Sequence, residues 1–219
     1  MSDELGFTHR FEPVRGDAGG PGTPTLLLLH GTGSDENDLL PLGRSLDSTA
    51  ALLSARGQVS ENGMSRWFRR HAEGVFDTDD LIARTHELAN FVGAAVESYG
   101  LDASKVIAVG FSNGANIAAA MLLLRPEVLR AAMLFAPMMT PSDLEPVDLS
   151  EVGAFLGAGR ADPIAPPDQV EDLAALLSDC GASVELRWHP GGHGIDQSVL
   201  TAAGSWLAKL RAATTDSLP

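Results

Sequence analysis

Short runs of consecutive apolar residues recur along the chain and define its predicted strands. The run at 25–29 (TLLLL) is apolar at nearly every position and is followed by His30 and Gly31. A strand that is apolar at successive positions has both faces buried, which is typical of a mostly parallel sheet covered by helices. On this basis we predict strands at 25–29, 50–56, 105–109, 130–136, 152–157 and 183–188.

Segments with helical patterns and helix-boundary residues separate these strands. The clearest follows Asp77, where Asp-Thr-Asp-Asp supplies an N-cap and an acidic first turn, and it ends at Gly100. In the helix expected at 36–46, Pro41 must lie in the first turn or break the helix. Helices are predicted at 36–46, 78–99, 113–124, 167–179 and 195–211, and the stretch 57–77 is predicted to be irregular. Strands and helices alternate from residue 25 to residue 211, so we predict one α/β domain over 1–219 with helices on both faces of the sheet.

The charge balance narrows the classes of partner. The chain has 219 residues, with 15 Lys and Arg against 29 Asp and Glu, which gives a formal net charge of −14. Such a surface repels nucleic-acid backbones and anionic lipid, so neither is an expected partner. No apolar run approaches the ~18 residues that a membrane span requires, and the first ten residues do not resemble a secretory signal. A single cysteine, Cys180, fits a reducing compartment, so we expect a cytoplasmic protein.

Residues capable of chemistry follow four of the predicted strands. In open α/β sheets, ligands bind at the carboxyl ends of the strands, so these turns are expected to lie close together. The four turns are HGTG at 30–33, GFSNG at 110–114, GRADP at 159–163 and HPGGHG at 189–194. Together they contain a serine between glycines, a carboxylate and two histidines, in the chain order Ser, Asp, His.

This set contains the parts that a serine nucleophile requires. A serine hydroxyl reacts readily only when a neutral imidazole removes its proton, and a carboxylate must orient that imidazole. Ser112 is the candidate nucleophile, Asp162 the candidate acid and His193 the candidate base. The alternatives are His189 for the base, and Asp168 or Asp196 for the acid.

The four turns resemble the motifs of the α/β-hydrolase superfamily. Within it, the chain resembles the small phospholipase/carboxylesterase family, which includes the acyl-protein thioesterases. The resemblance covers nearly the whole chain: LLLLHGTGSDENDLL looks like the oxyanion strand and turn, GFSNGA the nucleophile elbow, GRADPIAP the acid turn and GGHG the histidine turn. It implies an α/β-hydrolase fold with a mostly parallel sheet and little or no cap domain.

The resemblance also implies a role for each matching residue. Ser112 would be the nucleophile, His193 the general base and then the general acid, and Asp162 the residue that orients His193. The backbone N–H groups of Thr32 and Asn113 would form the oxyanion hole. The stretch MSRWF corresponds to a loop that lines the acyl pocket in relatives, so Trp67 and Phe68 are candidate pocket walls or buried packing residues. Met138 and Met139, after the strand at 130–136, are likewise candidates for the pocket or the core.

One residue departs from the pattern of the acyl-protein thioesterases. Those enzymes usually have Gln directly after the serine, whereas this chain has Asn113. The form GFSNGANIA looks more like bacterial carboxylesterases associated with the metabolism of hydroquinone and aromatic compounds. The oxyanion donor is a backbone group, so the departure bears on substrate class rather than on the oxyanion hole.

We therefore predict a serine carboxylesterase that hydrolyses small-molecule esters of short to medium acyl chain through an acyl-enzyme. The alternatives are an acyl thioesterase or lysophospholipase, and a non-catalytic binding protein with the hydrolase fold. No cofactor is expected, because the dinucleotide pattern G-x-G-x-x-G is absent. No metal is expected either, because Pro190 prevents a helix that would place His189 and His193 on one face. A monomer and a homodimer both remain open.

Overall fold

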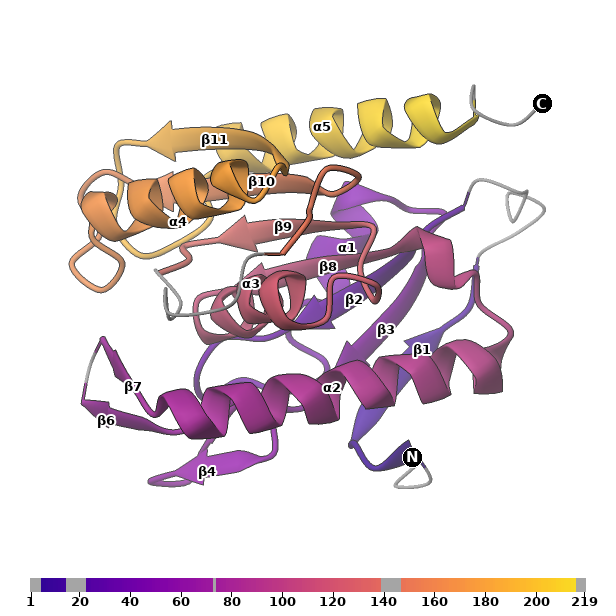
Figure 1. Ribbon diagram of the computed structural model, residues 1–219, viewed down its shortest axis with the longest axis horizontal. Helices are drawn as coiled ribbons and strands as arrows, with labels where there is room; N and C mark the ends of the chain where they lie inside the picture. The colour runs from indigo at the N-terminus through magenta and orange to yellow at the C-terminus, as the bar shows by residue number, and fades with distance from the viewer. Residues whose placement is uncertain (1–4, 15–22, 73, 139–146, 216–219) are drawn as a thin grey trace.

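A seven-stranded sheet forms the centre of the protein. The computed structural model describes residues 5–14, 23–72, 74–138 and 147–215. The strand order is β1-β3-β2-β8-β9-β10-β11, and every neighbouring pair is parallel except β1 with β3 (Figure 1). The strands are β1 (His9–Glu12), β2 (Thr25–Leu29), β3 (Ala51–Ala55), β8 (Val106–Phe111), β9 (Ala131–Phe135), β10 (Gly153–Gly159) and β11 (Ser183–His189).

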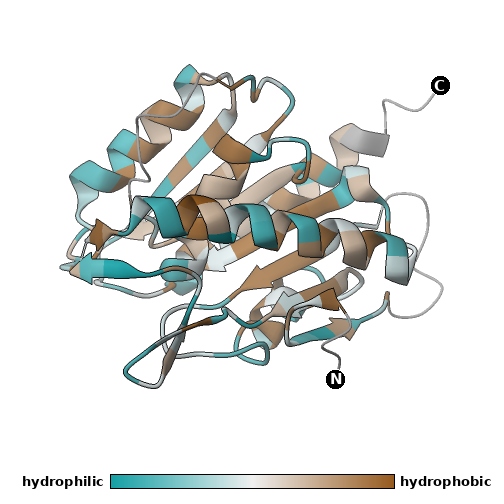
Figure 2. Ribbon diagram, turned by 60° about the horizontal axis from the view of Figure 1, so that its bottom comes forward, coloured by the Kyte–Doolittle hydropathy of each residue, from teal (hydrophilic) through white to brown (hydrophobic). Residues whose placement is uncertain are grey.

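Helices cover both faces of this sheet. Side chains of β2 alternate between two apolar clusters, with Leu27 in the cluster that includes residues of α2, α3 and α4, and Leu28 in the cluster on the side of α5. Figure 2 shows hydrophobic residues along the central strands, with hydrophilic residues interspersed on the helix that crosses in front of them. The α-helices are α1 (Leu40–Leu46), α2 (Thr78–Tyr99), α3 (Asn113–Leu124), α4 (Pro167–Asp179) and α5 (Gln197–Thr215), and a 3-10 helix spans Ala103–Lys105.

All six predicted strands are present, but the segment 57–77 differs from the prediction. It was expected to be irregular, and instead it contains two small antiparallel hairpins, β4 (Val59–Glu61) with β5 (Met64–Arg66) and β6 (Arg70–Ala72) with β7 (Val75–Phe76). Asn62 and Gly63 form the first hairpin turn with positive φ values of 52° and 81°, as two-residue hairpin loops require. These strands of two or three residues carry no apolar run, so the pattern used for the central strands did not indicate them.

Two further boundaries differ for local reasons. The helix predicted at 36–46 begins only at Leu40, with Pro41 in its first turn, where the missing proline N–H is not needed. The edge strand β1 was not predicted, because it is only four residues long and carries polar side chains. None of the described helices is both long and apolar enough to cross a membrane.

Truncation of a side chain in the central strand tests the two-sided core. Leu27 is fully buried, so Leu27→Ala should lower the free energy of unfolding by about 2–5 kcal/mol, because it removes apolar contacts and leaves a cavity. Urea unfolding followed by circular dichroism measures the change. The control Val75→Ala, at a side chain that is 52% exposed, should change stability by less than about 0.5 kcal/mol. Equal effects of the two substitutions would contradict this account of the core.

Candidate active site

Ser112 lies on a sharp turn between β8 and α3. Its backbone has φ 52° and ψ −116°, a combination that costs free energy for any residue other than glycine. Two backbone hydrogen bonds hold it: the Ser112 N–H donates to the Phe135 carbonyl at 2.8 Å, and the Ser112 carbonyl accepts from the Asn116 N–H at 3.0 Å. The turn thereby places the serine side chain at the carboxyl end of the sheet and at the N-terminus of α3.

Two glycines permit this turn. A Cβ atom added to Gly114 would lie 1.9 Å from the Leu29 carbonyl oxygen, and one added to Gly110 would lie 2.5 Å from the Gly114 carbonyl oxygen. Both contacts are with backbone atoms that cannot move aside easily. The first turn of α3 therefore packs directly on the end of β2, and only glycine fits at either position.

A continuous chain of hydrogen bonds joins Ser112 to His193 and Asp162. The distance from Ser112 Oγ to His193 Nε2 is 2.9 Å, and that from His193 Nδ1 to Asp162 Oδ2 is 2.7 Å. The carboxylate can only accept in this pair, so Nδ1 carries the proton and Nε2 is left to accept from the serine hydroxyl. The structure thus brings together the three residues that the sequence indicated from three separate strand ends.

Asp162 is held in place by its own turn. Its side chain is buried, and Oδ1 accepts hydrogen bonds from the N–H groups of Ile164 at 2.8 Å and Ala165 at 3.0 Å. These bonds leave Oδ2 directed at His193. The alternative acids lie elsewhere: Asp168 is in the first turn of α4, and Asp196 accepts from the Ser198 N–H at 2.7 Å.

His189 organises the loop that carries His193. The buried His189 ring accepts from the Gly191 N–H at 3.1 Å through Nδ1, and its Nε2 lies 3.1 Å from the Gly194 carbonyl, to which it donates. The loop rests on the end of β10, where a Cβ on Gly159 would lie 2.3 Å from the Gly192 carbonyl oxygen. His189 therefore acts within the loop and fixes the path that brings His193 over the sheet.

The predicted oxyanion donors lie on two adjacent strand ends. Leu29 pairs with Gly110 in parallel register, so the turn that contains Thr32 follows β2 next to the turn that contains Ser112. Within the part of the chain that the structure describes, the backbone N–H groups of Thr32 and Asn113 have no hydrogen-bond acceptor. Asn113 is also the first residue of α3, where the helix dipole favours negative charge.

A buried hydrogen-bond network supports the turn after β2. His30 Nε2 accepts from the Gly57 N–H at 3.0 Å, so its Nδ1 carries the proton and donates to the Gly31 carbonyl at 2.6 Å. Burial lowers the pKa of His30 below its usual 6.5, although the bond to the Gly31 carbonyl acts in the opposite direction. Both ring nitrogens of His30 are thus bonded to backbone groups, and the side chain holds the turn in place.

The structure buries the residues proposed as pocket walls. Trp67 is 2% exposed, Phe68 is fully buried and Met138 is 5% exposed. Trp67 donates its indole N–H to the His30 carbonyl at 2.9 Å, and the Met138 N–H donates to Asn116 Oδ1 at 2.8 Å. These contacts show packing and hydrogen bonding, and the role of the three residues toward a substrate stays a prediction. Met139 lies outside the described residues.

Two side-chain contacts of the predicted oxyanion residues, Thr32 and Asn113, were not indicated by the sequence. Arg66 Nη1 donates to Thr32 Oγ1 at 2.8 Å, and the Trp67 backbone N–H donates to Asn113 Oδ1 at 2.8 Å. Both depend on how residues 66 and 67 lie beside the segments that follow β2 and β8. The motif MSRWF contains the two donor residues, but the residue types in it do not indicate that Thr32 and Asn113 are their partners.

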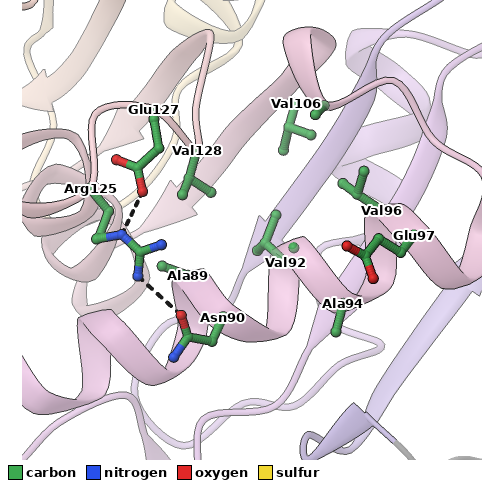
Figure 3. Close-up of a pocket in the computed structure, with 12 residues that line it drawn as sticks. Ala89, Asn90, Val92, Ala94, Val96, Glu97, Val106, Arg125, Glu127 and Val128 are labelled. Atoms are coloured by element: carbon green, nitrogen blue, oxygen red, sulfur yellow. Dashed lines mark hydrogen bonds and ion pairs between the residues drawn. The ribbon is translucent and has the colours of Figure 1, made fainter.

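The hollow drawn in Figure 3 lies away from Ser112. It has a volume of about 450 Å³ and is formed by α2 and the segment that follows α3, with Val92, Val106 and Arg125 in its lining. Val106 is the first residue of β8, whereas Ser112 follows the last residue of that strand. The hollow is therefore at the amino end of β8, opposite to the end at which Ser112 lies. Among the described residues, no cluster of three or more His, Cys, Asp or Glu side chains is arranged to hold a metal ion.

Comparison with known proteins identifies the family to which the chain is similar. Residues 16–211 match the phospholipase/carboxylesterase family. The chain is 47% identical over 181 residues to the protein MhqD of Bacillus subtilis (strain 168), an alignment that covers 83% of this chain and 90% of MhqD.

Solved structures give the same result for the fold. The carboxylesterase of Bacillus cereus has a TM-score of 0.89 and 41% identity, covering 93% of this chain and 94% of that chain. The carboxylesterase of Mesorhizobium loti has a TM-score of 0.87 and 35% identity, covering 95% and 97%. The predicted fold class is confirmed, as is the resemblance inferred from the four motifs. The chain belongs to the phospholipase/carboxylesterase family of α/β-hydrolases, a family of carboxylic ester hydrolases.

Proposed function

We propose that this protein is a serine carboxylesterase that acts through a Ser112–His193–Asp162 triad and a covalent acyl-enzyme. The observation that carries the proposal is the hydrogen-bond chain from Ser112 Oγ through His193 to Asp162, with distances of 2.9 Å and 2.7 Å. A non-catalytic binding protein would have no need for a strained serine turn aligned with a histidine ring nitrogen.

The first half of the proposed reaction forms the acyl-enzyme. His193 Nε2 removes the hydroxyl proton as Ser112 Oγ attacks the ester carbonyl carbon, and the carbonyl oxygen becomes an oxyanion. The N–H groups of Thr32 and Asn113 donate to that oxyanion, and Asp162 stabilises the imidazolium. His193 then transfers its proton to the alkoxide leaving group, so that the alcohol departs and the acyl group remains on Ser112.

The second half repeats these steps with water as the nucleophile. His193 removes a proton from water, and the resulting hydroxide oxygen bonds to the acyl carbon to form a second oxyanion at the same place. Collapse of this intermediate breaks the bond to Ser112 Oγ, which takes back a proton from His193. The products are a carboxylic acid and the regenerated enzyme, and no other reactant is needed.

We propose neutral esters with short to medium acyl chains as the substrates. Met64, beside Gly33, and Ile164, two residues after Asp162, are 39% and 36% exposed, so apolar surface is available near the oxyanion turn and the acid turn. The net charge of −14 disfavours strongly anionic substrates. A cytoplasmic location fits a chain whose one cysteine cannot form an intramolecular disulfide.

Replacement of the nucleophile and the base tests the triad. Ser112→Ala and His193→Ala should each lower kcat for p-nitrophenyl acetate by roughly 10⁴-fold or more, because each removes a member of a unit that acts together. Initial rates on purified, folded variants measure the loss. His189→Gln is the matched control in the same loop, and it should retain far more activity than His193→Ala. If His193→Ala retained more activity than His189→Gln, His189 would be the general base.

Replacement of the acid gives a different result. Asp162→Asn keeps the size of the side chain but can donate to His193 Nδ1, which favours the wrong imidazole tautomer. We expect kcat to fall by about 10⁴-fold, while fluorophosphonate labelling of Ser112 becomes slower and remains detectable. Asp168→Asn, on the first turn of α4, serves as the control and should behave as the wild type. Normal turnover by Asp162→Asn would require another carboxylate as the acid.

A series of substrates tests the assigned class. Values of kcat/KM for p-nitrophenyl esters from acetate to palmitate, an acyl thioester and a lysophospholipid should be highest for the shorter esters. A clear preference for the thioester or the lysophospholipid would replace the carboxylesterase assignment by one of those activities. Absence of all hydrolysis, together with absence of fluorophosphonate labelling, would favour the alternative of a non-catalytic binding protein.

A further inference from the structure

Three consecutive residues at the end of the first hairpin and directly after it, Ser65, Arg66 and Trp67, contact both halves of the predicted oxyanion hole. The Ser65 carbonyl accepts from the Gly33 N–H at 2.9 Å, and Arg66 donates to Thr32 Oγ1 at 2.8 Å. Trp67 reaches both sides, because its backbone N–H donates to Asn113 Oδ1 at 2.8 Å and its indole N–H donates to the His30 carbonyl at 2.9 Å. The segment 65–67 thus connects the turn after β2 with the turn after β8.

Arg66 is the charged member of this segment, and it is almost completely buried. Its side chain is 4% exposed, its Nε lies 3.3 Å from the Phe68 carbonyl oxygen, and the same nitrogen is 3.2 Å from Glu61 Oε2. A buried arginine costs free energy unless acceptors surround it, and an apolar side chain of similar size often serves stability equally well. One of the contacts of this guanidinium, that of Nη1 with Thr32 Oγ1, reaches a residue of the predicted oxyanion hole.

The contact with Thr32 suggests a role for Arg66. Thr32 precedes Gly33, which has a φ of 84°, so the backbone at this turn is not held in a regular element. A charge-assisted hydrogen bond to Thr32 Oγ1 restricts the threonine side chain and the peptide that carries it. The position of an oxyanion donor is critical, since small displacements of catalytic groups lower rates severely.

We propose that Arg66 is a positioning residue for the oxyanion hole, acting through the hydroxyl group of Thr32. The inference rests on the proposed esterase function and names a residue beyond the triad. The oxyanion exists only in the transition states and tetrahedral intermediates, so the loss of Arg66 should lower kcat and leave KM nearly unchanged. Acylation and deacylation use the same hole, so the effect should appear whichever step limits turnover.

The test compares Arg66→Met, Thr32→Val and the double variant on p-nitrophenyl butyrate. Each single substitution should lower kcat by roughly 10- to 100-fold, with KM changed by less than about 3-fold. The double variant should lose little more than the worse single variant, because both substitutions remove the same hydrogen bond. Rates are divided by the number of reactive serines that a fluorophosphonate titrates, so unfolded protein does not contribute.

Arg44→Met is the matched control. Arg44 is also a largely buried arginine, with a side chain 16% exposed, that binds a carboxylate, Glu12, and a backbone carbonyl, that of Ala50. Arg44 lies near the amino end of β3, whereas Ser112 lies at the carboxyl ends of the parallel strands. Replacement of Arg44 should lower stability but change kcat by less than about 3-fold, because no group of the site depends on it.

Four results would overturn the proposal: unchanged kcat in both single variants, an equal loss in Arg44→Met, losses that multiply in the double variant, or a rise in KM in place of a fall in kcat. If Arg66→Met does not fold, Thr32→Val alone decides, because it removes the acceptor and leaves the arginine in place. Ser112→Ala is measured in the same assay. Retained hydrolysis by Ser112→Ala would contradict the proposed function itself, whereas an inactive Ser112→Ala with active Arg66→Met and Thr32→Val would contradict only the role of Arg66.

Discussion

The left-handed backbone of Ser112 is the constraint on which the rest of the site depends. A φ of 52° on a residue with a side chain costs about 1–3 kcal/mol, and the surrounding structure has to supply that free energy. It does so through hydrogen bonds to β9 and α3 and through two glycines that let α3 start against the end of β2. The same turn fixes the origin of α3, the position of the Asn113 N–H and the place to which His193 must reach.

Much of the fold could be predicted because the central strands are buried on both faces. A run such as TLLLL has no polar position to obscure the pattern, and the helix boundaries at Asp77 and Gly100 are set by local capping. The edge strand β1 and the hairpins of 59–76 could not be predicted in this way. Their strands are short and partly exposed, so their conformation depends on contacts with distant segments rather than on their own pattern.

The residues of the site also include some that the sequence indicated and others that it did not. Ser112, Asp162 and His193 could be identified because each follows a predicted strand, and a parallel sheet brings such residues to one edge. Arg66 could not be identified, because its partner Thr32 is 34 residues away and the contact requires β5 to lie beside the oxyanion turn. The sequence indicated Asn113 as a backbone N–H donor and as a difference from the thioesterase pattern, and the structure shows that its side chain also accepts the Trp67 N–H. The residue after the serine is thus part of the packing of the site as well as a difference from the thioesterase pattern.

The loop that carries His193 has a consequence for the synthesis of the chain. It follows β11, the last strand in chain order among the described residues, and it rests on Gly159 at the end of β10. A nascent chain contains Ser112 and Asp162 before it contains His193, because the histidine is the last of the three in chain order. The hydrogen-bonded set of Ser112, His193 and Asp162 therefore cannot be complete until synthesis has passed residue 193.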